Sequence, residues 1–203
     1  MRRCCVKRAA APGSTEWILG VGSLSLTVTS AGIINLGFTN QDGVGNGFVG
    51  TQQLCDGAWH TVEIDFTDNG TRVFVDGVRD TSLTLSQYPQ PNSGGDIAIG
   101  ARQILFTSGF GGKIDEVSFW NGNLHFDEDS YTPPAVPWTG SEDNLAALYH
   151  LDGDFTSSVA TGGTGGWTLS GTMTIPPGTF RDFYITFNSL TTATLQSVGA
   201  GDA

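Results

Sequence analysis

The stretch that decides the fold is residues 58–80, AWHTVEIDFTDNGTRVFVDGVRD. From Val62 to Phe66 apolar residues alternate with polar ones, which is the period of a half-buried β-strand. Asp68-Asn69-Gly70 follows, and Asn-Gly tolerates the positive φ angles that tight hairpin turns need. Residues 72–75 provide the returning strand, and Asp76-Gly77 predicts a second tight turn. The segment therefore predicts an antiparallel hairpin.

Similar patterns recur on both sides of this hairpin. Alternation or a short apolar run predicts strands at residues 23–29, 33–38, 96–100, 112–120, 145–151, 167–169, 172–175 and 182–187. Residues 40–50 hold four glycines and predict a loop, and three prolines within residues 131–144 predict a linker or a covering segment. No helical period is sustained for three turns. The chain is therefore predicted to be all-β.

The composition supports one large sandwich with many tight turns. The chain has 203 residues, of which 29 are glycine and only 14% are charged. Its net charge is −11, and four of its nine basic residues lie within residues 1–14, which we expect to form a basic N-terminal arm. An acidic body argues against nucleic-acid grooves and anionic membranes as partners. It fits an extracellular or virion-surface protein, or one that binds cations such as calcium.

The cysteines and the chain ends give few constraints. Cys4 or Cys5 could pair with Cys55, but the odd count leaves one thiol over, so we favour free cysteines. The basic N-terminus is not followed by the apolar run of a signal peptide, and no segment is apolar enough to span a membrane. Secretion would then need another route, whereas a virion protein released by lysis would need no signal.

Several motifs resemble the laminin-G-like and concanavalin A-like lectin/glucanase family. Trp59-His60, the hairpin and Val73–Gly77 are similar to its central hairpin, and Gly112–Val117 resembles its closing strand. Tyr131–Trp138 looks like the segment that follows in phage virion proteins, and Leu148–Asp154 resembles the family's first strand. The resemblance implies a jelly-roll β-sandwich of two antiparallel sheets. It also implies a binding module for glycans or proteins, often with one calcium ion.

Compared with this family, the motifs occur in circularly permuted order. Residues 15–130 resemble the back half of the sandwich, 131–144 the linker, and 145–203 the front half. The front half could fold back on its own chain, as in a circular permutation. It could instead complete a neighbouring copy by strand exchange, which would build head-to-tail filaments. Because a Pro-rich linker is stiff, we favour exchange.

Two carboxylate sets are candidate sites. Glu63 and Asp65 share one strand face, as in retaining glucanases, but the third carboxylate would be Asp68 at the turn. We therefore predict a solvated strand face and no enzyme activity. The resemblance instead suggests a calcium site from Asp115, Asp152 and Asp154, whose oxygens suit that ion.

Other residue types give weaker indications. Histidines 60, 125 and 150 show no ligand spacing, and the Asn69-Gly70-Thr71 glycosylation sequon is explained by the turn. Trp17, Trp120, Trp138 and Trp167 could stack on sugars, although strand aromatics usually belong to the core. The favoured hypothesis is a non-enzymatic structural subunit of a virion appendage or surface filament. The alternatives are a calcium-dependent glycan-binding module and, as the weakest, a retaining glycosidase.

Overall fold

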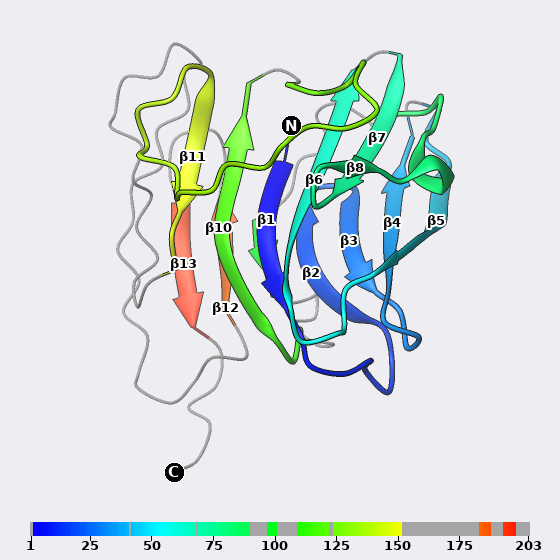
Figure 1. Cartoon of the computed structure of the whole chain (residues 1–203), viewed down its shortest axis with the longest axis horizontal. Coiled ribbons are helices and arrows are strands. Elements are labelled where there is room, and N and C mark those ends of the chain that lie inside the picture. Colours follow the sequence, from blue (N-terminus) through cyan, green and yellow to red (C-terminus); the bar gives the residue numbers. More distant parts are fainter. Residues whose placement is uncertain are drawn as a thin grey trace.

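The fold is a sandwich of two antiparallel β-sheets, seen in a computed structural model (Figure 1). The structure describes residues 2–40, 42–67, 69–89, 97–100, 109–121, 124–151, 183–187 and 193–197, the last two segments and residues 2, 5 and 97 as backbone only. The predicted all-β jelly roll is confirmed. The only helical element among these residues is a 3₁₀ turn at Thr81–Leu83, and no helix in the described part could cross a membrane.

Sheet A holds the central hairpin. Its strands, in spatial order, are β11 (Leu145–Tyr149), β10 (Lys113–Trp120), β1 (Arg2–Lys7), β6 (Trp59–Thr67), β7 (Gly70–Val75) and β8 (Val78–Arg79). Thr67 pairs with Gly70 and Val75 with Val78, so both predicted turns are confirmed. Strand register in such hairpins follows from local alternation and turn chemistry, which is why the sequence predicts it well.

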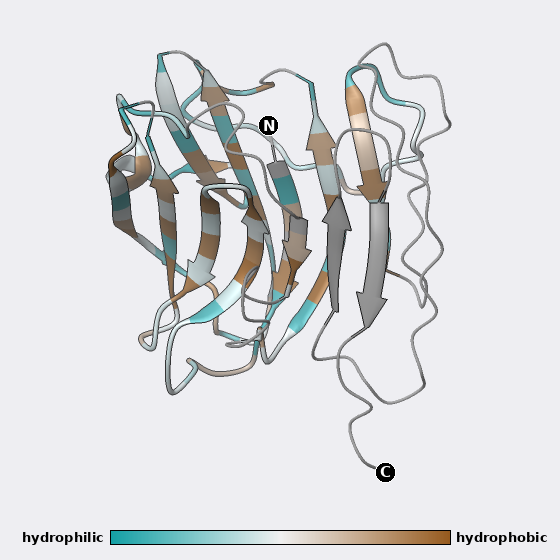
Figure 2. Cartoon of the chain, turned by 180° about the vertical axis from the view of Figure 1, so that it is seen from behind, coloured by the Kyte–Doolittle hydropathy of each residue, from teal (hydrophilic) through white to brown (hydrophobic). Residues whose placement is uncertain are grey.

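Sheet B forms the second layer. Its order is β13 (Ala193–Ser197), β12 (Phe183–Phe187), β9 (Ile97–Ile99), β2 (Glu16–Val21), β3 (Leu24–Val28), β4 (Ile33–Thr39) and β5 (Gly45–Gln53). Seen from behind, hydrophobic and hydrophilic residues alternate along strands β2 to β5 (Figure 2). The core between the sheets includes Val6, Ile18, Leu26, Ile34, Leu36, Val62, Ile64, Val73 and Val117, each at most 1% exposed.

Two sequence predictions about strands were wrong. Residues 2–7 are not a free arm, because β1 lies between β10 and β6 and buries Cys4 and Val6 in the core. Residues 45–53 are not a loop but the edge strand β5. At Gly50 a Cβ would lie 2.6 Å from both Ile34 Cγ2 and Asp80 Oδ2, so this glycine serves close packing of β5 rather than a turn.

The second half of the chain joins the same sandwich. Strand β11 pairs with the chain's own β10, with Val117 opposite Tyr149, and β12 pairs with β9. The fold-back within one chain is therefore the arrangement in this structure, whereas the exchange with a second copy stays a prediction. Cys55 is a free thiol, as predicted. The predicted strands at residues 167–169 and 172–175 lie outside the described residues.

Candidate functional site

A covering segment crosses the outer face of sheet A, the face turned away from sheet B (Figure 1). This segment, residues 124–144, is called the strap. At one side Tyr131 N donates to Gly77 O over 2.8 Å, and Arg79 N donates to Asp129 O over 3.1 Å. At the other side the Trp138 ring packs edge-on against Trp120 with centroids 4.9 Å apart. The strap therefore divides the outer face into a covered and an open part.

The strap lies on side chains of the central strands. Arg3 of β1 is 4% exposed, and its guanidinium carbon lies 5.5 Å from the Tyr131 ring centroid and 5.3 Å from that of Trp138. Such contacts between a cation and aromatic rings are strongest where water is excluded. The prolines of residues 131–144 thus belong to a covering segment that is packed on the sheet. A free linker would make no such contacts.

Under the strap lies a cluster of three polar residues, Glu63 and Asp65 of β6 and His125 of the strap. Both carboxylates belong to residues that are 0% exposed. The His125 backbone N donates to Asp65 Oδ2 over 2.8 Å, and its Nδ1 lies 2.7 Å from Glu63 Oε1. The prediction that Glu63 and Asp65 form a solvated strand face is therefore wrong, because the strap covers them.

Aromatic rings fix the imidazole in this cluster. Tyr131 stacks on His125 with centroids 3.8 Å apart and an interplanar angle of 4°, and Phe74 packs edge-on against both rings. Burial raises the pKa of the Glu63 carboxyl and that of Asp65, although hydrogen bonds from His125 act in the opposite direction. Burial also raises the pKa of the Tyr131 hydroxyl. The cluster is a rigid, dehydrated site with excess acceptor oxygens.

The open part of the outer face begins at Trp59, the first residue of β6. Its side chain is 46% exposed, which is unusual for so large an aromatic residue. Lys7 of β1 pairs with Trp59 on one side and with Lys113 of β10 on the other. Opposed residues of neighbouring strands share a sheet face, so these three side chains form one cross-strand row.

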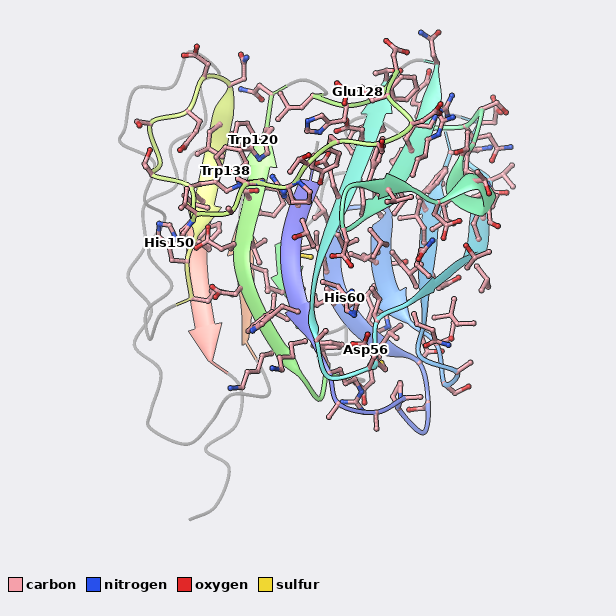
Figure 3. The ribbon with its side chains drawn as sticks, viewed as in Figure 1. Asp56, His60, Trp120, Glu128, Trp138 and His150 are labelled. Carbon is pink, nitrogen blue, oxygen red and sulfur yellow. The ribbon has the colours of Figure 1, made fainter. Side chains whose placement is uncertain are left out.

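Two carboxylates, those of Asp56 and Asp76, are held by His60 at the same end of β6, and Figure 3 labels Asp56 and His60 there. His60 Nε2 lies 2.9 Å from Asp56 Oδ1, and His60 Nδ1 lies 2.8 Å from Asp76 Oδ2. Both aspartate side chains are about half exposed, at 54% and 50%. Burial is the largest single influence on the pKa of His60 and lowers it. The hydrogen bonds and charges of the two aspartates together outweigh it, so the pKa is raised.

The predicted calcium ligands are only partly placed. Asp115 lies on β10, where its Oδ1 accepts a hydrogen bond from Glu116 N over 2.9 Å. Asp152 and Asp154 lie outside the described residues, as does Asp68, the third carboxylate considered for catalysis. The calcium set therefore stays a prediction. Among the described residues, the group that could hold a metal ion is instead Glu63, Asp65 and His125.

The structure also places several of the tryptophans and histidines that the sequence singled out. Trp120 is buried with Leu145 and Leu148, whereas Trp138 is half-buried and packs on Trp120. Trp17 is half-buried in β2, and Trp167 lies outside the described residues. His150 Nδ1 lies 2.5 Å from Glu116 Oε1. Trp59, whose ring is exposed, was not among the tryptophans that the sequence singled out. Trp59 is at an odd-numbered position of β6, like Glu63 and Asp65. The alternation therefore indicated that its side chain points away from the core.

Comparison with known proteins agrees with this architecture. The sequence profile of the concanavalin A-like lectin/glucanases superfamily matches residues 5–128. None of the curated proteins compared matches the chain. Among solved structures, a "putative carbohydrate binding protein" from Bacteroides ovatus ATCC 8483 superposes with a TM-score of 0.58 at 18% identity, covering 77% of this chain and 48% of its own. At this identity the likeness shows the fold alone, and this chain spans about half of that protein.

Proposed function

Since this chain belongs to the concanavalin A-like lectin/glucanase superfamily, we propose that it is a non-enzymatic carbohydrate-binding module. The observation that carries the proposal is the exposed indole of Trp59 on the open part of sheet A. A flat aromatic face suits the apolar C–H face of a pyranose ring. Because an isolated exposed tryptophan costs hydrophobic free energy, a ligand that covers it would recover that free energy.

Polar groups near Trp59 could orient the sugar. Asp56 and Asp76 are held by His60 at the same end of β6 and remain half exposed, so they can accept hydrogen bonds from sugar hydroxyls. Lys7, opposite Trp59, can donate. One apolar platform with a few placed polar groups is the usual composition of a small-molecule site. The similar Bacteroides ovatus structure, named for carbohydrate binding, supports this function over an assembly role.

The buried position of Glu63 and Asp65 supports the non-enzymatic part of the proposal. A glycosidase acid and nucleophile must both contact the scissile bond. Here both residues are 0% exposed beneath the strap, so a polysaccharide chain does not reach them in this structure. We expect no release of reducing sugar from β-glucans by the wild-type protein. Turnover that Glu63→Gln removes would contradict this expectation.

The main structural argument for the filament hypothesis, which was strand exchange between subunits, is weakened. Exchange between subunits was favoured because a stiff Pro-rich linker would resist folding back, but in this structure β11 pairs with β10 of its own chain. Carbohydrate binding therefore ranks ahead of assembly from head-to-tail copies. An extracellular location and a calcium ion remain proposals that come with the lectin-like hypothesis.

The test is a glycan array followed by titration calorimetry with the best ligand. We expect binding that Trp59→Ala abolishes and Trp59→Phe partly retains, because phenylalanine keeps a smaller ring face. Val49→Ala is the matched control, since Val49 is 57% exposed on β5 of the opposite sheet. Equal affinity of the wild-type protein and Trp59→Ala would overturn the proposed site.

A further inference from the structure

We propose that Glu63, Asp65 and His125 bind a divalent transition-metal ion that fastens the strap to sheet A. One ligand atom from each residue lies within 4.8 Å of the others, and two of the residues belong to β6 while the third belongs to the strap. This site is separate from the calcium set at Asp115, Asp152 and Asp154, and it goes beyond glycan binding. The ion would be a structural cross-link between segments 60 residues apart in sequence.

Buried carboxylate oxygens without hydrogen-bond partners provide the second observation in favour of a metal ion. Glu63 Oε2 and Asp65 Oδ1 are buried and lack a hydrogen-bond partner among the described residues. Buried polar atoms are nearly always satisfied, and an unpaired buried carboxylate is costly. A cation between the two carboxylates would engage both free oxygens at once.

Nearby basic side chains do not provide that compensation. Arg3 is the cross-strand partner of Glu63, but its guanidinium lies over Tyr131 and Trp138. Arg72 donates from Nη1 to the backbone oxygens of Thr71 and Leu85. Within the described part of the chain, neither carboxylate forms an ion pair with arginine or lysine. Among the described residues, a direct ion pair with the cluster's carboxylates thus comes from His125 alone.

The ligand types select the class of metal. Two carboxylate oxygens with an imidazole nitrogen suit zinc or manganese, whereas calcium prefers oxygen ligands alone. The imidazole is already oriented by the stacked Tyr131 ring and by the hydrogen bond from its backbone N to Asp65. In binding, the ion would replace the proton that now joins His125 Nδ1 and Glu63 Oε1, and that proton would be released to solvent.

The experiment uses the full chain, stripped with a chelator and titrated separately with Zn²⁺, Mn²⁺ and Ca²⁺. We expect one Zn²⁺ or Mn²⁺ per chain, proton release on binding, a higher melting temperature and slower amide exchange in the strap. Glu63→Gln, Asp65→Asn and His125→Ala should each weaken binding by more than about tenfold, while Ca²⁺ should bind to this cluster far more weakly.

Glu116→Gln is the matched control, because Glu116 forms a similar pair with His150 but the two do not belong to a three-residue metal-binding group among the described residues. If wild-type protein that is folded by circular dichroism binds none of the three ions, the proposal is wrong. Binding that is unchanged in both Glu63→Gln and His125→Ala would also overturn it. Neither outcome involves a sugar, so the test is independent of the Trp59 site.

Discussion

The guanidinium of Arg3 lies 5.3 Å from the ring centroid of Trp138, although the two residues are far apart in the sequence. Arg3 belongs to the central strand β1 and Trp138 to the strap. The Arg3 guanidinium also lies over the ring of Tyr131. Arg3 therefore connects the first strand of the protein to the strap that covers it. Local sequence patterns contain no indication of this contact, but the stability of the strap depends on it.

We expect Arg3→Ala to lower the free energy of unfolding by about 1–3 kcal/mol, because it removes a buried cation from two aromatic rings. Arg3→Lys should recover only part of this loss, since an ammonium lacks the planar guanidinium. Urea denaturation measures both. Arg79→Ala is the control, because its ion pair involves the largely exposed Asp129 and should contribute about 0–1 kcal/mol. Equal losses at positions 3 and 79 would contradict the packing argument.

The second prediction concerns the contact between the strap and the turn after β7. Gly77 has φ +79°, and a Cβ there would lie 2.0 Å from Tyr131 O. Gly43 has nearly the same φ, +78°, but nothing lies within 4 Å of its Cβ position. Gly77→Ala should therefore destabilise the protein by about 2 kcal/mol or more, and Gly43→Ala by about 1 kcal/mol.

Because both alanines would adopt the same left-handed backbone, the difference between the two variants isolates the clash with the strap. Thermal unfolding and amide exchange of residues 124–131 provide the measurements. If the two variants have the same stability, the close approach of the strap to Gly77 is not a tight contact in solution.

The third prediction is a pH dependence caused by His60. The pKa of this imidazole is raised in the folded protein because Asp76 and Asp56 outweigh the effect of burial. A raised histidine pKa means that the folded state binds the proton more tightly than the unfolded state. Its contribution to stability is therefore fully present below the ordinary pKa of about 6.5 and is lost as the pH rises through the raised value.

His60→Asn should remove this slope, so its stability should differ most from that of the wild-type protein near about pH 5–6 and least above the raised pKa. Denaturant unfolding between about pH 5 and 9 measures the slope, and NMR titration of the imidazole measures the pKa directly. A variant with the same slope as the wild-type protein would show that other groups cause the pH dependence.

The sequence alone determined the features that depend on neighbouring residues. The alternation from Val62 to Phe66 and the Asn69-Gly70 turn fixed the β6–β7 hairpin, because strand period and turn chemistry act over a few residues. The same local rules predicted most other described strands and the all-β class. They failed at β1, where basic residues suggested a free arm, and at β5, where glycines suggested a loop. Pairing with neighbouring strands stabilises both.

The tertiary structure decided what lies on each strand face. Glu63 and Asp65 appeared solvated because alternation places them opposite the core, and nothing local shows that residues 124–144 return to cover them. The same strap leaves Trp59 open, although it stands on the same strand face. Burial is a property of segments distant in sequence, so the acidic cluster, its histidine and the exposed tryptophan platform became visible only once the strap was placed on the sheet.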